Sequence, residues 1–167
     1  MAMRRFLFFI VFLLGLGTIT VHAQQDSIPT DSVLYQQAIQ AFQDQRFRLK
    51  VNSYEDHVRP IKPVQSKSYV ALWNGNIVIS CYPGGWANSS SGWLSGGRVA
   101  NYRMKTDKKG NLRVTVTYRD DAGRAAKLIF RLKQGSNHCS MTCNPIKFFS
   151  KFSLTGELLT MLLMVVL

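Results

Sequence analysis

Short alternating segments separated by turn residues constrain the fold of this chain more than any other feature. From residue 47 onward, apolar and polar side chains alternate in successive runs; in one of them Leu112, Val114 and Val116 alternate with Arg113 and threonines. A period of two residues buries one face of a strand and leaves the other in water. No helical pattern separates the runs, which argues against parallel βαβ units.

Turn-forming residues stand between these runs. Asn74-Gly75 is a strong hairpin signal, because both residue types accept the positive φ angles that a two-residue turn requires. Further turns are expected at residues 107–110, 120–123 and 134–137. The sequence therefore predicts a mainly β domain, an antiparallel meander of about eight strands that is either barrel-like or a curled sandwich.

One amphipathic helix is expected before the strands. Residues 31–45 carry apolar side chains at helical spacing, and Thr30 or Asp31 is placed to cap the helix. A single helix of this length cannot bury its own apolar stripe, so we expect it to pack on the sheet. The expected core combines inward-facing strand residues with two helix residues: Phe47, Leu49, Val51, Val114, Val116, Leu128, Phe130, Leu132, Ile39 and Phe42.

The N-terminus has the features of a cleavable signal peptide, residues 1–23. Arg4 and Arg5 precede the apolar stretch 6–16, and residues 21–23 form a small-x-small cleavage site. The apolar stretch is shorter than the ~20 residues that a membrane-spanning helix needs. We therefore expect an exported protein, periplasmic or extracellular, with no transmembrane helix in the mature chain.

The remaining chain divides into a leader (24–30), a single β-rich domain with its helix (31–158) and an apolar tail (159–167). The last strand is expected from Phe152 to Leu158, because the alternation stops there. The tail is too short to cross a bilayer as a helix. We expect it to bind something outside the domain or to be an addition to a complete fold.

The chain is strongly basic, with 21 Lys and Arg residues against 9 Asp and Glu residues and a formal net charge of +12 at pH 7. An exported domain with this charge is expected to meet anionic lipid headgroups or acidic glycans rather than nucleic acid. Most basic residues fall on the wet faces of strands. Their ordinary interpretation is a solvated surface.

The residues that usually carry catalysis are sparse. His57 and His138 are isolated, and in a strand His138 points away from the face of Cys139. Metal ligands do not cluster, and no phosphate-binding Gly-Lys-Ser/Thr motif occurs. We therefore expect no catalytic residue, no metal site and no cofactor: the protein is predicted not to be an enzyme.

The three cysteines leave two alternatives open. Cys139 and Cys143 are separated by ~13 Å if they lie in one strand, which is too far for a disulfide. Either Cys81 pairs with one of them across strands, or all three are small buried apolar side chains.

From Phe47 to Leu158 the sequence carries a set of motifs that point to a known family. These are Ser66–Trp73 with Asn74-Gly75-Asn76, Gly92-Trp93-Leu94-Ser95-Gly96-Gly97, Val99-Ala100-Asn101-Tyr102, Lys105–Asn111 and Ser153-Leu154-Thr155-Gly156. With them the chain resembles a family of small exported Bacteroidetes proteins known as domain of unknown function 4251. The resemblance implies an exported β-rich domain without a known activity, and it supplies no catalytic residues.

The segment from Tyr82 to Gly97 is the candidate binding loop. It is rich in glycine and serine and contains Trp86 and Trp93, and long loops in compact domains are often functional. The two indole rings are expected to close over an apolar ligand or stack on a sugar. In the alternative interpretation, they simply plug one end of a barrel.

Two functional hypotheses follow. In the leading one, the protein is an exported, non-enzymatic binding module for a small apolar molecule or a glycan, with ligand-binding residues Tyr82, Trp86 and Trp93. This hypothesis predicts a cavity beneath the loop, lined by Phe47, Leu49, Leu128 and Phe130. In the alternative, it is a structural or surface-interaction protein that docks on anionic envelope components. That hypothesis predicts a filled core and a continuous basic patch.

Overall fold

The structure is a computed structural model that describes residues 30–56, 62–82, 93–145 and 151–161. The predicted signal peptide and most of the predicted leader lie outside these residues. The described elements, in chain order, are α2 (Asp31–Gln43), β1 (Phe47–Asp56), β2 (Lys62–Pro63), β3 (Tyr69–Trp73), β4 (Asn76–Cys81), β5 (Trp93–Thr106), β6 (Leu112–Arg119), β7 (Ala125–Leu132), β8 (His138–Pro145) and β9 (Phe152–Thr160).

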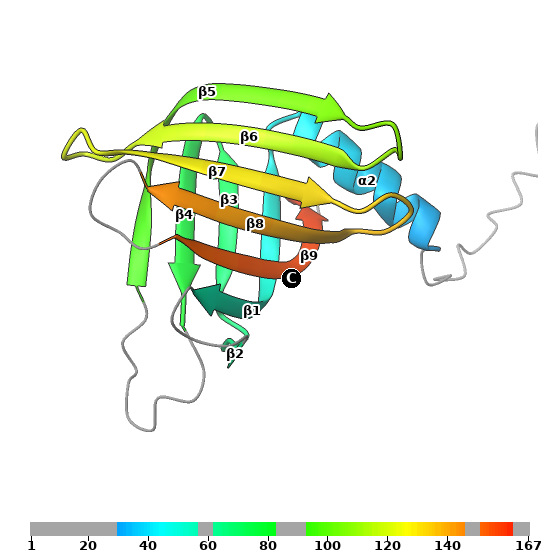
Figure 1. The fold of residues 1–167 in the computed structure, drawn as a ribbon, viewed down its shortest axis with the longest axis horizontal. Coiled ribbons are helices and arrows are strands. Elements are labelled where there is room, and N and C mark those ends of the chain that lie inside the picture. Colours follow the sequence, from blue (N-terminus) through cyan, green and yellow to red (C-terminus); the bar gives the residue numbers. More distant parts are fainter. Residues whose placement is uncertain (1–29, 57–61, 83–92, 146–150, 162–167) are drawn as a thin grey trace, which may run out of the picture.

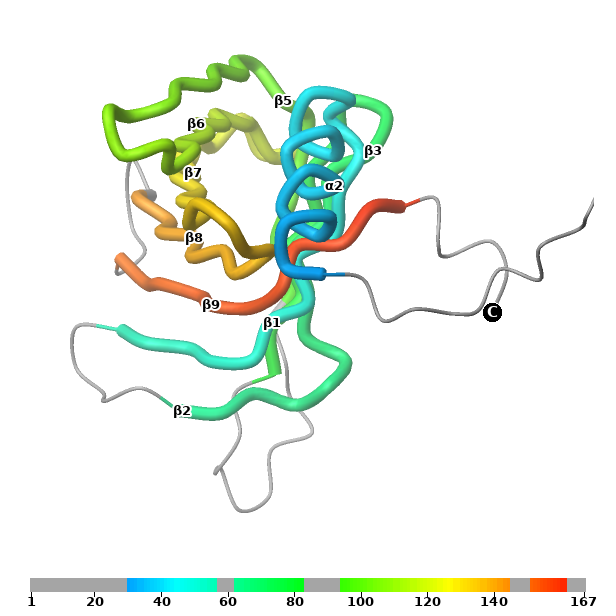
Figure 2. The backbone as a smooth tube through the Cα atoms, turned by 90° about the vertical axis from the view of Figure 1, so that its right-hand side faces the viewer, coloured from blue at the N-terminus to red at the C-terminus, as the bar shows by residue number. Residues whose placement is uncertain are grey.

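Eight of these strands close into an antiparallel barrel (Figures 1 and 2). Strands β3 to β9 pair in sequence order, and β1 pairs with both β3 and β9. The two-residue strand β2 lies outside this circle, beside Ser53 and Tyr54 of β1. The predicted β meander is therefore confirmed, and the β1–β9 pairing decides for the barrel over the sandwich.

The predicted hairpin signal forms the turn between β3 and β4. Asn74 and Gly75 have φ angles of 50° and 71°, the left-handed values that a type I′ turn needs. The turn residues 107–110, 120–123 and 134–137 likewise connect β5 to β6, β6 to β7 and β7 to β8. Local turn chemistry thus fixes the order of the strands in the sheet.

The inward faces of the strands form one core. Every strand residue of the predicted core is at most 2% exposed. Of the two helix residues, Phe42 is fully buried and Ile39 packs against the core while partly exposed. Outward neighbours such as Arg113 and Lys127 are exposed, so the predicted register is confirmed.

Helix α2 packs on one end of the barrel (Figure 2). The ring of Phe42 makes edge contacts with those of Phe47 and Phe130, at centroid distances of 4.8 and 5.7 Å. The hydroxyl of Tyr35 donates to the carbonyl oxygen of Gly110 over 2.7 Å. The helix ends at Gln43, two residues before the predicted end, because Gln45 adopts a left-handed φ of 53° and turns the chain into β1.

The last strand continues beyond Leu158, where the sequence pattern predicts its end. Leu159 and Thr160 still belong to β9 and pair with Arg48 and Phe47 of β1. The pattern fails here because β9 is not an edge strand: the closed barrel gives its last residues a partner. Residues 162–167 of the apolar tail lie outside the described part.

Within the described ranges, none of the helices has the length and apolar character needed to span a membrane.

Candidate functional site: a cationic face on the barrel

The structure describes part of the predicted binding loop. Tyr82 follows β4 and is half-buried; its backbone N–H donates to Ser68 Oγ over 2.9 Å, and the Lys67 ammonium lies 3.9 Å from the centroid of its ring. Trp86 lies outside the described residues. Trp93 is the first residue of β5, paired with Cys81 in register, but its side chain is outside the described part.

The loop is shorter than the sequence predicts. Residues Trp93 to Gly97 are strand, paired with Cys81 to Ile77 of β4. The glycines of this stretch made it resemble a loop, whereas Gly96 is needed for close strand packing. A Cβ at Gly96 would strike the carbonyl oxygen of Ile77.

The four residues predicted to line a cavity beneath the loop belong to the buried core. Phe47 and Phe130 pack against the helix, with ring centroids 5.2 Å apart. Leu49 and Leu128 are also fully buried. Side chains therefore fill the space that these four residues surround.

The cysteines form no disulfide with one another and are small buried side chains, which is the second of the two alternatives given by the sequence. Cys81, Cys139 and Cys143 are free and buried. Burial raises the pKa of each thiol from 9.0 to about 12, so at neutral pH they are protonated and poor nucleophiles. His138 is exposed while Cys139 is 1% exposed, which confirms that the two side chains point to opposite faces.

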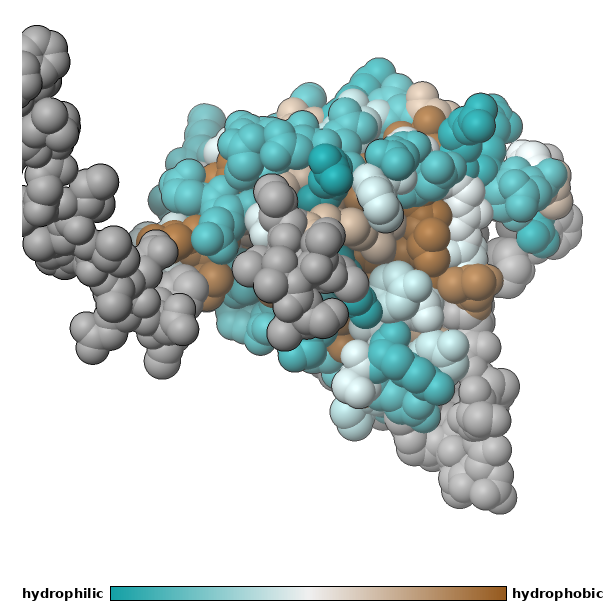
Figure 3. Space-filling model, turned by 180° about the vertical axis from the view of Figure 1, so that it is seen from behind, coloured by the Kyte–Doolittle hydropathy of each residue, from teal (hydrophilic) through white to brown (hydrophobic). Residues whose placement is uncertain are grey.

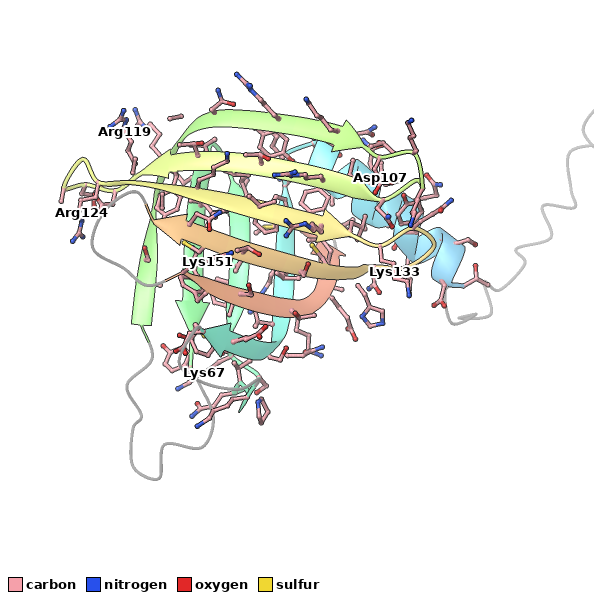
Figure 4. The ribbon with its side chains drawn as sticks, viewed as in Figure 1. Lys67, Asp107, Arg119, Arg124, Lys133 and Lys151 are labelled. Atoms are coloured by element: carbon pink, nitrogen blue, oxygen red, sulfur yellow. The ribbon has the colours of Figure 1, made fainter. Side chains whose placement is uncertain are left out.

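The outer side of β5, β6 and β7 gathers positive charge. Seven exposed Lys and Arg side chains point outward from these three strands, and we call this set the cationic face: Arg98, Arg103, Lys105, Arg113, Arg119, Lys127 and Arg131. Figure 4 shows basic side chains projecting from these strands into solvent.

Strand register aligns the charges of the cationic face in rows. Lys105 lies directly opposite Arg113, which lies directly opposite Arg131. At the other end of the strands Arg98 lies opposite Arg119. Neighbouring strands are ~4.8 Å apart, and like charges in directly opposed positions destabilise a sheet. The sequence does not predict these rows. Alternation shows which face of the sheet a residue lies on, but not which residue of the next strand lies opposite it.

In the part of the chain that the structure describes, no acidic side chain neutralises these rows by an ion pair. Among the described residues, no member of the cationic face forms an ion pair, and the Asp120 carboxylate is bound instead by Arg124, 2.6 Å from its Nε. Desolvation opposes ionisation of Asp120, but the hydrogen bonds from Arg124 outweigh it and lower the pKa. Asp107 is likewise engaged locally, where hydrogen bonds from Asn111 lower its pKa. Figure 4 shows Asp107 and Arg119 at opposite ends of the strands.

A different surface lies behind, on β3 and β4. Hydrophobic residues gather there among hydrophilic ones (Figure 3), and Trp73 is 51% exposed. The guanidinium of Arg46 lies 5.9 Å from the Trp73 ring centroid, and that of Arg48 lies 4.4 Å from the Tyr69 ring centroid. This surface meets the cationic face where Asn76 of β4 pairs with Arg98 of β5.

The barrel and its N-terminal helix place the chain among small antiparallel β-barrel proteins. Among them, the chain is similar to the crystal structure of a DUF4251 family protein from Bacteroides eggerthii, with a TM-score of 0.65 and 24% sequence identity, over 78% of this chain and 89% of that one. The resemblance drawn from the sequence motifs is confirmed. No family model matches the sequence. No curated protein matches it either.

Proposed function

We propose that this chain is an exported, non-enzymatic surface-interaction protein whose cationic face binds anionic components of the cell envelope. The observation that carries the proposal is the row Lys105, Arg113 and Arg131. Three cations in directly opposed positions repel one another, since the spacing of neighbouring strands is well inside the ~8 Å screening length at physiological salt. A partner with matching negative charges relieves that repulsion.

The absence of intervening acids distinguishes this face from an ordinary solvated surface. Soluble domains typically intersperse charges of both signs, whereas in the described part of the chain the carboxylates of Asp107 and Asp120 are engaged at the turns. Electrostatic attraction to an anionic surface also grows with each Lys or Arg near it. Seven cations on one side of a small barrel favour docking over simple solubility.

A ligand held at Tyr82, Trp86 and Trp93 stays a prediction of the sequence. The packed rings of Phe47 and Phe130 leave no room for an apolar ligand between them. The geometry of the described residues therefore supports surface docking better than binding inside the barrel. The buried thiols, with pKa values of about 12, add support for a non-enzymatic role.

The proposal is tested by charge removal on the exported chain. The variant Lys105→Gln, Arg113→Gln, Arg131→Gln is compared with the charge-matched control Lys50→Gln, Lys62→Gln, Lys151→Gln, whose cations belong to the β1, β2 and β9 side. Binding to immobilised acidic polysaccharide and to phosphatidylglycerol vesicles is measured against salt. We expect the first variant to bind at least ~10-fold more weakly and the control to bind like the wild type. Equal losses in both variants would mean that net charge alone acts and would overturn the proposal.

A further inference from the structure

A hollow of about 420 Å³ lies at one end of the cationic face. It forms where three segments meet: the β3–β4 turn, the middle of β5 and the β6–β7 turn. Its polar and backbone lining comes mainly from Asn76, Gly97, Arg98, Ala100, Arg119 and Asp121. The hollow is thus built from residues far apart in the sequence and brought together by strand register.

Irregular backbone shapes this hollow. The β5–β6 register shifts between Val99 and Asn101, so Ala100 is the extra residue of a β-bulge, a feature that is frequent beside binding and active sites. The backbone N–H of Val99 donates to the carbonyl oxygen of Gly75 over 2.8 Å and fixes the β3–β4 turn against the bulge. A Cβ at Gly97 would strike the carbonyl oxygen of Arg119, so the floor of the hollow depends on glycine.

The charges around the hollow leave two guanidinium groups available. Arg98 and Arg119 are exposed, directly opposed in register and without an ion pair to any described residue. Asp120 also lines the hollow, but Arg124 binds both of its carboxylate oxygens, over 2.8 and 2.6 Å. The charge of Asp120 is therefore already matched, whereas Asp121, which also lines the hollow, is exposed and forms no ion pair with a described residue. An anion placed between Arg98 and Arg119 meets two guanidinium groups that no carboxylate of the described residues engages.

The same row of paired residues continues to an exposed aromatic ring. Trp73 pairs with Asn76, Asn76 with Arg98, and Arg98 with Arg119. Four neighbouring strands span ~14 Å, so one row offers a ring, an amide and two guanidinium groups over the length of a short oligosaccharide. The Arg46 guanidinium lies over the Trp73 ring. The Trp73 residue is nevertheless 51% exposed.

We propose that this row is a subsite for an acidic saccharide. The sugar carboxylate or phosphate binds between Arg98 and Arg119, hydroxyl groups hydrogen-bond to Asn76 and Asp121, and a sugar ring stacks on Trp73. The inference rests on the proposed docking function and names its ligand class. A mixture of donors, acceptors and an exposed ring fits a polyhydroxylated anion better than a lipid headgroup, which offers fewer hydroxyl groups to recognise.

The test titrates the exported chain with oligogalacturonate, with inorganic phosphate and with phosphatidylglycerol vesicles, by calorimetry and tryptophan fluorescence. The variants are Arg98→Gln with Arg119→Gln, and separately Trp73→Ala and Trp73→Phe. The matched control is Lys50→Gln with Lys62→Gln, and thermal melting checks that each variant folds. We expect the double arginine variant to bind oligogalacturonate at least ~10-fold more weakly. Trp73→Ala weakens binding, and Trp73→Phe largely retains it.

Several outcomes would overturn this subsite, and they separate its failure from that of the docking function. If removal of Lys105, Arg113 and Arg131 abolishes binding while the Arg98 and Arg119 variant binds normally, docking stands and the subsite is wrong. If phosphate binds as tightly as oligogalacturonate, or if the double arginine variant loses only vesicle binding, the ligand class is wrong. If neither set of substitutions weakens any binding, both proposals fail.

Discussion

The hydroxyl of Tyr102 on β5 donates a 2.6 Å hydrogen bond to the carbonyl oxygen of Phe42. Phe42 belongs to the last turn of the helix, where carbonyl oxygens lack partners within the helix, and its carbonyl oxygen also accepts from the backbone N–H of Gln45 over 3.1 Å. The bond therefore ties the helix end to the barrel wall while the Phe42 ring enters the core. Burial raises the pKa of Tyr102 above its ordinary value of 10.0, which keeps this donor protonated over the physiological range.

Replacing Tyr102 with Phe removes this bond and leaves the Phe42 carbonyl without its tyrosine partner. We expect the free energy of unfolding to fall by about 1 kcal/mol, measured by urea denaturation. Tyr69→Phe is the control, because Tyr69 lies on the outer side of β3, with its ring against the Arg48 guanidinium. An unchanged urea midpoint for Tyr102→Phe would contradict the assigned role.

The buried thiols predict a loss of stability in alkali. Well below pH 9 the thiols are protonated in both the folded and the unfolded chain, so their contribution is fully present. Between pH 9 and 12 the unfolded chain releases thiol protons that the folded chain retains, since the folded pKa values are about 12. The free energy of unfolding therefore falls as the pH rises through this window.

This loss is measured by comparing urea midpoints at pH 8 and at about pH 10.5. Alanine at Cys81, Cys139 and Cys143 should make the drop smaller than in the wild type. The buried tyrosines contribute equally to both proteins, so the difference isolates the thiols. His138→Gln is the control and should leave the drop unchanged; an identical drop in the alanine variant would contradict the prediction.

The loop hypothesis makes its own prediction. If a lipid or glycan binds at Trp86 and Trp93, its addition shifts tryptophan fluorescence. The double variant Trp86→Ala, Trp93→Ala then abolishes the shift with little change in melting temperature. Trp73→Phe is the control that excludes the subsite on β3 as the source of the signal. If the double variant unfolds instead, the two rings belong to the core and the plug interpretation holds.

Because β9 ends at Thr160, two deletions of the apolar tail have different expected effects. Deletion of Met161–Leu167 leaves every paired residue of β9 in place, so the domain should stay folded and become more soluble. Deletion of residues 159–167 also removes Leu159 and Thr160, which pair with Arg48 and Phe47, and should lower the melting temperature. If the deletion of Met161–Leu167 unfolds the protein, the tail is part of the core.

Local signals allowed much of the fold to be predicted. Asn74-Gly75 identified its hairpin because the turn chemistry is contained in two residues, and the alternation from Leu112 to Tyr118 identified which side chains are buried. The closing pair β1–β9 was not predictable in this way, because it joins strands from opposite ends of the domain. The sequence of neither strand indicates that the other strand is its partner.

The sequence predicts that the residues of the cationic face are basic and exposed, but not which of them are neighbours. The alternation placed Arg113 and Arg131 on the wet side, yet only the register makes them direct neighbours. The bulge at Ala100 changes which residues of β5 share a face, and no sequence pattern marked it. The sequence indicates a loop at Gly97, because a glycine that close strand packing requires cannot be told from one in a flexible loop.

The pairing of Phe47 with Thr160 has a consequence for how the chain folds. Neighbouring hairpins such as β3–β4 close short loops, whereas the pairing of β1 with β9 closes a loop that contains nearly the whole domain. Contacts of such long sequence separation slow folding. Until β9 arrives, β1 and β8 each keep one unpaired edge, which is a template for association with other chains. The barrel is therefore most exposed to aggregation in the interval before its C-terminal strand becomes available.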